Sequence, residues 1–211
     1  MDIYRSERLK YVPIGDIKHE EFFYNMMQEP AVLNADPSLP VGFTMMQVDA
    51  AVKRLAERKL LAMYVCLQDL SAKPIGFVAL SKPNAGSEQH GSSSLSISIT
   101  TAYQRQGYGR EAIAWALDWA FDLARLHRVE IACFSWNPGA KRLYGRVGFR
   151  EEGLKREVAW FMGAWHDMHE MAMLEHEWRD KWREAAKAGT WAPEDGKSYS
   201  DEQLAEKMGS A

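Results

Sequence analysis

The sequence predicts a mixed α/β (α+β) fold, because strand-like and helix-like patterns alternate along the middle of the chain. Residues 95–99 alternate apolar and polar side chains with a period of two, as a half-buried strand does. Residues 111–126 contain no Gly or Pro and place apolar side chains at helical spacing. Residues 128–136 are again rich in β-branched and aromatic side chains, which favours a second strand.

The same patterns divide the preceding part of the chain into three strands and two helices. Two-residue alternation or a short apolar run indicates each strand, and apolar side chains three and four residues apart indicate each helix. Pro and Gly in residues 35–42 predict a loop between the helices. The predicted strands are 8–13, 62–68 and 74–80, and the predicted helices are 19–33 and 45–60.

After residue 136 the sequence predicts a short helix and a hairpin. Residues 140–147 have a helical pattern, and Gly148 is a suitable C-terminal cap for them. Alternation resumes at residues 154–161, a turn falls at Gly163, and a strand then runs to residue 174. Before the strand at 95–99, the Gly- and Ser-rich residues 84–94 predict a mobile loop.

The C-terminal part of the chain has a different composition. Residues 175–188 are charged and helix-prone, with Trp178 and Trp182 one helical turn apart. Two exposed indoles on one face would be an unusual apolar patch, so we expect both to be buried, on the domain itself or in a homodimer. Residues 189–211 are polar and predict a loose tail. We therefore divide the chain into a domain at 1–178 and a charged helical extension with a polar tail at 179–211.

Composition and charge are those of a water-soluble protein with one ample core. The 211 residues favour a single domain, and the net charge of −3 argues against non-specific nucleic-acid binding. No apolar run approaches the length of a membrane span, and the N-terminus has no signal-peptide pattern. We therefore expect a cytoplasmic protein that binds neither nucleic acid nor membrane. Cys66 and Cys133 lie in apolar strand-like runs, which predicts buried, reduced thiols.

A loop with two glycines joins the strand at 95–99 to the helix that follows. It runs from Gln104 to Arg110, with Gly107 and Gly109 one residue apart. A strand-to-helix loop of this kind aims backbone N–H groups and the positive end of the helix dipole at one point, which favours an anion such as phosphate. The loop lacks the Lys-Ser/Thr of a Walker loop and the third glycine of a dinucleotide fingerprint. Taken alone, it fits a phosphate site and a simple helix-entry turn equally well.

Two stretches in the right order carry a resemblance to a known family. The first is the loop pattern Gln/Arg-x-x-Gly-x-Gly at residues 104–109. The second is a strand that ends at Asn137, followed by a short helix that contains Tyr144 and then by Gly148-Phe149. Together they resemble the GNAT superfamily of acyl-CoA-dependent N-acetyltransferases over roughly residues 5–178. The detail is most similar to the branch that contains ribosomal-protein N-terminal and small-amine acetyltransferases.

The resemblance implies a mostly antiparallel central sheet that is splayed in the middle and has helices on both faces. It also implies acetyl-CoA as co-substrate, a primary amine as acceptor, and direct attack in a ternary complex. Tyr144 matches the family tyrosine that protonates the departing sulfur, and a phenol with a reference pKa of ~10 can donate a proton near neutral pH. The residues that the resemblance assigns to acetyl-CoA are Ile99, Thr101, Gln104, Arg105, Gln106, Gly107, Tyr108, Gly109, Arg110 and Asn137.

The group that deprotonates the amine is left open. Many family members carry a Glu on the strand before the phosphate loop, where this chain offers Ser94, Ser96 and Ser98. An ordered water remains a candidate, and the missing Glu keeps open a CoA-binding protein with little or no transfer activity. From residue type alone, Tyr144 fits a core position and Asn137 a helix N-cap. The candidate carboxylates are Glu29, Asp36, Glu130 and Glu157.

The histidines do not predict a metal site. His166 and His169 are close in sequence, but residues three apart in a strand point to opposite faces, so both imidazoles cannot bind one ion. On the same predicted hairpin, Trp160, Phe161 and Trp165 suggest an aromatic wall for an apolar or cationic amine, with packing at the sheet edge as the alternative. The sequence does not distinguish a small amine, an amino acid, an antibiotic or a protein N-terminus as acceptor.

Overall fold

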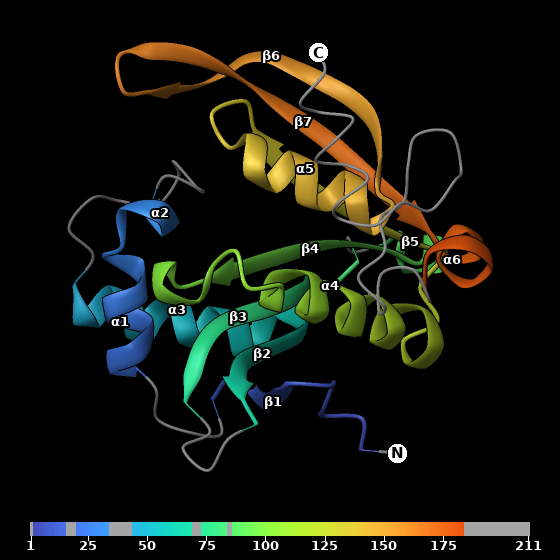
Figure 1. The fold of residues 1–211 in the computed structure, drawn as a ribbon, viewed down its shortest axis with the longest axis horizontal. Helices are drawn as coiled ribbons and strands as arrows, with labels where there is room; N and C mark the ends of the chain where they lie inside the picture. The colour runs from blue at the N-terminus through green and yellow to red at the C-terminus, as the bar shows by residue number, and fades with distance from the viewer. Residues whose placement is uncertain (1, 16–19, 34–43, 69–72, 84–85, 184–211) are drawn as a thin grey trace.

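A seven-stranded sheet forms the centre of the molecule (Figure 1). The computed structural model describes residues 2–15, 20–33, 44–68, 73–83 and 86–183. The spatial order of the strands is β1-β2-β3-β4-β5-β7-β6, and only β4 and β5 pair in parallel. The predicted mixed, mostly antiparallel sheet is confirmed. Its strands are β1 (Leu9–Pro13), β2 (Lys59–Leu67), β3 (Pro74–Ser81), β4 (Ser92–Ile99), β5 (Arg128–Phe134), β6 (Arg150–Phe161) and β7 (Ala164–Leu174).

The parallel pair β4–β5 is a short seam between two antiparallel halves of the sheet. Only three residue pairs connect it, from Ser92 opposite Arg128 to Ser94 opposite Glu130. Beyond that point β4 continues on β3 as far as Ile99, while β5 continues on β7. The two strands therefore separate towards their carboxyl ends, which is the splay that the family resemblance implied.

Helices cover both faces of the sheet, as predicted. On one face, α1 and α3 pack against β1–β3 around the buried side chains of Phe23, Met26, Val48 and Tyr64. On the other face, α4 and α5 cover the seam (Figure 1). Short 3-10 turns η1 and η2 and π-helical turns η3 and η4 complete the described elements. Their bounds are α1 (Glu20–Met27), α2 (Pro30–Leu33), α3 (Met45–Arg58), η1 (Glu88–His90), η2 (Thr101–Tyr103), α4 (Tyr108–Asp118), η3 (Trp119–Leu123), α5 (Pro138–Val147), α6 (Glu175–Glu177) and η4 (Trp178–Trp182).

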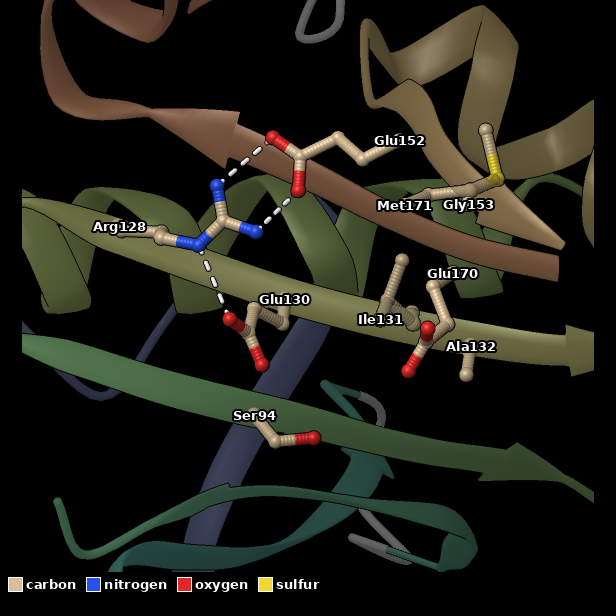
Figure 2. Close-up of a pocket in the computed structure, with 9 residues that line it drawn as sticks. All are labelled: Ser94, Arg128, Glu130, Ile131, Ala132, Glu152, Gly153, Glu170 and Met171. Carbon is tan, nitrogen blue, oxygen red and sulfur yellow. Dashed lines mark hydrogen bonds and ion pairs between the residues drawn. The ribbon is translucent and has the colours of Figure 1, made fainter. Parts of the chain in front are cut away.

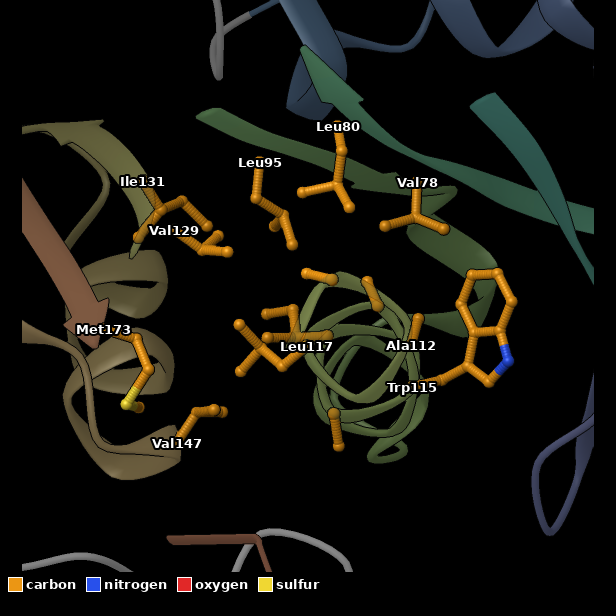
Figure 3. Packing of buried hydrophobic residues seen from close by; sticks show 14 of the residues in the cluster. Val78, Leu80, Leu95, Ala112, Trp115, Leu117, Val129, Ile131, Val147 and Met173 are labelled. Atoms are coloured by element: carbon orange, nitrogen blue, oxygen red, sulfur yellow. The ribbon is translucent and has the colours of Figure 1, made fainter. Parts of the chain in front are cut away.

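The main core surrounds α4 (Figure 3). This helix is wrapped by apolar side chains from both halves of the sheet, so α4 holds together strands that the seam connects only briefly. At its outer side, the Trp115 ring stacks on Tyr11 of β1, with centroids 3.6 Å apart. The strand and helix side chains drawn around α4 include Val78, Leu80, Leu95, Val129, Ile131, Val147 and Met173.

The predicted helix at 19–33 is wrong as a single element. It is divided into α1 and α2, and α2 begins at Pro30. Proline has no N–H for an intrahelical bond and disfavours helical backbone in the residue before it, so the break falls at Gln28 and Glu29. This break turns the Glu29 side chain towards the end of β4, which becomes important below.

Other element boundaries also differ from the prediction. The segment predicted as a mobile loop contains η1, and β4 starts inside it at Ser92. Its serines are typical of turns. However, Ser93 Oγ donates to the Ser81 carbonyl at 2.8 Å and Ser94 N donates to Ser81 Oγ at 2.8 Å, and these bonds connect the start of β4 to β3. Four elements, β2, α4, α5 and β6, begin two to four residues before their predicted starts at 62, 111, 140 and 154, and α3 ends two residues before its predicted end at 60.

The C-terminal elements pack on α4. Trp178 is fully buried, and its Nε1 donates to Asp118 Oδ1 at 3.1 Å. Arg183 Nε donates to the same Asp118 atom at 2.7 Å. Burial of Trp178 on the domain is therefore confirmed. The side chain of Trp182 and residues 184–211, with the predicted tail, lie outside the described residues. None of the described helices is both long enough and apolar enough to cross a membrane.

Candidate active site

The predicted phosphate loop lies between the end of β4 and the start of α4. Gly107 is the N-cap of α4 with φ of 83°, and Arg105 also has a positive φ of 59°. Only glycine adopts the Gly107 conformation without strain. Because glycine has no capping side chain, the first N–H groups of α4 are left for another acceptor, and the positive end of the helix dipole lies at the same place. This geometry suits an anion.

Arg8, on the segment that leads into β1, contacts this loop and the start of α4. Its Nε donates to Glu111 Oε2 at 2.8 Å, its Nη1 donates to the Gln106 carbonyl at 3.0 Å, and its guanidinium lies 4.5 Å from the Tyr108 ring centroid. A Cβ on Gly107 would meet Arg8 Nη2 at 3.1 Å. Sequence reasoning missed Arg8, because its partner Glu111 is 103 residues away and no local pattern connects the two.

A second arginine at the loop has an unsatisfied donor. Arg110 Nε is buried and has no hydrogen-bond partner among the described residues. Buried donors are normally paired, so an unpaired guanidinium nitrogen beside an uncapped helix start fits a site for a phosphate group. Gln104, Arg105 and Gln106 are exposed on the same loop. The pyrophosphate of acetyl-CoA fits the charge of these residues, with Arg105 and Arg110 as its candidate counterions.

At the strand end, the groups expected to hold the pantetheine arm have partners within the protein. Gln104 Nε2 donates to the Ile99 carbonyl at 2.8 Å. Thr101 donates from both its backbone N and its Oγ1 to Glu29 Oε2, each at 2.7 Å. Glu29 comes from the break between α1 and α2, so the break and the strand end are directly connected.

The second strand-to-helix turn, after β5, positions the candidate acid. Asn137 caps α5, and its Oδ1 accepts from Ala140 N at 3.1 Å. Two turns further along α5, Tyr144 is only 8% exposed. Burial raises the pKa of the Tyr144 phenol well above its usual range, with a smaller contribution from nearby Cys133. The phenol is therefore protonated throughout the physiological range, as an acid that protonates a thiolate must be.

Both cysteines are free and buried, as predicted. Burial raises the pKa of the Cys66 thiol and of the Cys133 thiol to about 11. Both groups are therefore protonated and unreactive near neutral pH.

A polar hollow of about 360 Å³ lies on the face of the seam opposite α4 (Figure 2). In it, the Arg128 guanidinium is held between Glu152 and Glu130, with Arg128 Nε 2.9 Å from Glu130 Oε1. Glu130, a candidate base, is therefore already ion-paired. Hydrogen bonding by Arg128 holds the pKa of the Glu152 carboxyl below its usual range. Ser94 also lines the hollow, where β4 and β5 begin to separate.

The aromatic residues of the β6–β7 hairpin do not form one wall. Trp160 and Trp165 pair across the strands, edge to face, and both are more than half exposed. Phe161 stacks instead on Trp136, with centroids 4.7 Å apart. Successive strand residues point to opposite faces, so Phe161 lies on the other side of the hairpin from Trp160. The predicted wall of three aromatic residues is wrong for this reason.

The two histidines of β7 also lie on opposite faces. The His166 ring contacts the edge of Trp136, whereas His169 Nδ1 lies 2.6 Å from Glu151 Oε1 and 3.1 Å from Lys141 Nζ. These contacts lower the pKa of the Glu151 carboxyl, chiefly through His169. Within the part of the chain that the structure describes, no group of three or more His, Cys, Asp or Glu side chains is arranged to hold a metal ion.

Comparison with known proteins identifies the family. The model of the acetyltransferase (GNAT) domain matches residues 8–150. The chain belongs to the GNAT acetyltransferase family. Members of this family use acetyl-CoA, and the matched residues include the whole loop, Asn137 and Tyr144.

Individual relatives agree with this assignment. The chain is 30% identical to a spermidine N(1)-acetyltransferase of Vibrio cholerae over 115 residues, which cover 54% of this chain and 65% of that protein, less than two thirds of its length. Two solved structures share the fold. A GNAT-family acetyltransferase from Bacillus anthracis has a TM-score of 0.70 at 22% identity, covering 82% of this chain and 99% of the other. Spermidine N-acetyltransferase from Vibrio cholerae in complex with CoA and spermine has a TM-score of 0.66 at 24% identity, covering 82% and 97%.

Proposed function

We propose that this chain is an N-acetyltransferase that transfers an acetyl group from acetyl-CoA to a primary amine. The amine attacks directly while both substrates are bound together. The observation that carries the proposal is a combination within one GNAT domain. The glycine start of α4 is uncapped and lies beside the buried Arg110 Nε, which has no hydrogen-bond partner among the described residues, and α5 carries a buried, protonated Tyr144. The first suits binding of the donor, and the second suits departure of its sulfur.

Each residue has a separate role in this proposal. The N–H groups at the start of α4, with Arg105 and Arg110, bind the pyrophosphate. The ends of β4 and β5 separate beyond the seam, and in this proposal the pantetheine arm lies between them, beside Ile99, Thr101 and Asn137. The acetyl group is supplied by acetyl-CoA, and Tyr144 gives a proton to the sulfur that leaves.

The acceptor proposed here is a small amine. Support comes from the Vibrio cholerae relatives, which are named as acting on spermidine and crystallised with spermine. We further propose that residues 1–178 form the catalytic domain and that the protein forms a homodimer.

The test is release of free thiol from acetyl-CoA on addition of a panel of primary amines, with binding of CoA measured in parallel by calorimetry. We expect amine-dependent thiol release and CoA binding by the same protein. CoA binding without thiol release for any amine would favour the second candidate, a CoA-binding protein with little or no transfer activity. The lack of a carboxylate on β4 is the observation that keeps this second candidate in view.

A further inference from the structure

The strand that leads to the phosphate loop carries no proton acceptor. Its side chains on the face away from α4 are Ser94, Ser96 and Ser98, and a serine hydroxyl is not a base near neutral pH. A primary amine is mostly protonated under the same conditions and must lose a proton before it attacks. If the chain transfers acetyl groups, either an ordered water or another side chain near β4 takes that proton.

Two of the other candidate carboxylates are unsuitable on geometric grounds. Glu130 is ion-paired with Arg128 inside the hollow. Glu157 is exposed on β6, the far edge strand, with β7 and β5 between it and β4. Asp36 lies outside the described residues.

Glu29 is the carboxylate that lies at the end of β4. Its Oε2 accepts from Thr101 N and from Thr101 Oγ1, each at 2.7 Å. Its backbone is fixed by the turn before Pro30, because Glu29 N donates to Met26 O at 3.1 Å and Val32 N donates to Glu29 O at 2.9 Å. The side chain is therefore held from both ends at the point where β4 and β5 have separated. Among the described residues, the side-chain hydrogen bonds of Glu29 engage Oε2 and none engages Oε1, which could therefore accept from an incoming amine.

We propose that Glu29 is the general base of the transfer reaction. The proposal rests on the proposed function and assigns the missing base to the α1–α2 break instead of to β4. The two hydrogen bonds from Thr101 orient the carboxylate, and its negative charge attracts the ammonium form of the acceptor to the strand end. Thr101 acts through Glu29 and is a positioning residue in this scheme.

The proton transfers balance as follows. Glu29 takes one proton from the R–NH3⁺ acceptor, and the freed nitrogen lone pair forms the new C–N bond to the acetyl carbon. The C–S bond breaks with its electron pair on sulfur, which receives the Tyr144 proton and leaves as a thiol. The nitrogen gives up a second proton, which restores the Tyr144 phenol through solvent, and it keeps its third proton in the amide. Glu29 returns its proton to water, so one proton is released for each amide formed.

The decisive variant is Glu29→Gln, because its amide oxygen can still accept both Thr101 hydrogen bonds but cannot act as the base. We expect turnover with a strongly basic amine to fall about 100-fold or more, as is typical when a general base is removed. We expect CoA affinity and melting temperature to stay unchanged. Glu21→Gln, on the exposed side of α1, is the matched control and should behave like the wild type.

The basicity of the acceptor amine can show whether Glu29 acts as a base or only has a structural role. Turnover of wild type and Glu29→Gln is compared for the most basic and the least basic primary amine that the wild type acetylates. We expect the defect to shrink for the least basic amine, because a larger fraction of it is already neutral. An equal loss for both amines, together with a lower melting temperature, would make Glu29 a brace and overturn the proposal.

Three further outcomes would also decide whether Glu29 is the base. Tighter CoA binding by Glu29→Gln with undiminished turnover would show that Glu29 merely competes for Thr101 N–H, which overturns the proposal. If the wild type acetylates no amine at all, the proposed function itself fails and the base falls with it. A fully active wild type with a fully active Glu29→Gln variant removes Glu29 alone and leaves the proposed function intact.

Discussion

The two strand-to-helix turns, after β4 and after β5, make the same kind of connection but differ in the residues that start the helix. Both connect a central strand to a helix that packs on the same face of the sheet. The turn into α4 starts at Gly107, which has no capping side chain, and has Arg8 and Arg110 beside it. The turn into α5 starts at Asn137, whose side chain caps the helix, and Pro138 follows at the first helical position.

This difference between the helix starts suits the α4 turn to ligand binding and the α5 turn to the placement of a catalytic side chain. An uncapped helix start offers its N–H groups to a ligand, so the α4 turn is suited to hold an anion. A capped helix start with proline is satisfied by its own chain and is rigid, so the α5 turn is suited to fix the position of Tyr144. Changes at the α4 turn should therefore alter affinity for CoA, and changes on α5 should alter turnover or stability.

The largest effect is expected on α5. Tyr144→Phe removes the proposed proton donor, so turnover should fall by ~100- to 10,000-fold, while acetyl-CoA affinity stays unchanged because only the developing charge on sulfur is affected. The measurement is single-turnover thiol release with calorimetry of CoA binding. Tyr4→Phe, at an exposed position, is the control. A folded Tyr144→Phe variant with full turnover would remove the tyrosine from the mechanism and erase the contrast between the two turns.

The next largest effect is expected at the α4 turn. Valine at position 107 would be forced into a left-handed conformation that costs about 1–3 kcal/mol, and its Cβ would press on Arg8. Because 1.4 kcal/mol is a factor of ten in Kd, we expect CoA affinity to fall by about 10- to 100-fold. Gly86→Val is the matched control, since Gly86 has nearly the same φ of 82° but open space around it. Equal CoA binding by both variants would refute the phosphate loop.

A substitution at Gly109 is expected to have a smaller effect than one at Gly107. Its φ is not in the left-handed region, and an added Cβ would meet Leu143 at 3.5 Å, which is ordinary contact. Gly109→Ala should therefore cost much less affinity than Gly107→Val. The sequence pattern alone does not distinguish Gly107 from Gly109, whereas their backbone conformations do.

The features that local patterns determine could be predicted from the sequence. The alternation in β4, the apolar face of α4, Asn137 as N-cap and the order of strands and helices all follow from short-range periodicity or capping chemistry. The start of β4 was missed because serine is typical of turns, whereas here hydrogen bonds to Ser81 on the neighbouring strand hold these serines in the sheet. A helix break at Pro30 was visible in the sequence but was outweighed by the apolar spacing on either side.

The features that depend on distant contacts could not be predicted. Arg8 reaches the loop only because β1 lies beside α4, and its partner Glu111 is 103 residues away. Glu29 was one of several candidate bases in the sequence, and its contact with Thr101, 72 residues away, is what distinguishes it. The division of the hairpin aromatics between two faces also required the strand register.

A smaller effect is expected from a substitution of Arg8, which contacts the phosphate loop. Arg8→Gln removes the ion pair to Glu111 and the bond to the Gln106 carbonyl. The Arg8 side chain is 39% exposed, so we expect a loss of at most about 1 kcal/mol, or about fivefold in CoA affinity. Arg5→Gln, which breaks an exposed pair with Asp2, is the control and should leave affinity unchanged. A loss as large as that of Gly107→Val would mean that Arg8 contacts the anion directly.

The smallest effect is expected from the cap of α5. Asn137→Ala removes the acceptor for Ala140 N, and loss of such a cap costs about 1 kcal/mol of stability. For a chain of this size, that lowers the melting temperature by about 2–4 °C. Thr44→Ala, which uncaps α3 in the same way, should cost a similar amount of stability but leave turnover unchanged. If α5 positions Tyr144, only Asn137→Ala should also lower turnover, and Asn137→Asp, which keeps an acceptor oxygen, should restore both properties. Identical turnover for the Asn137 and Thr44 variants would show that the α5 cap has no part in placing the tyrosine.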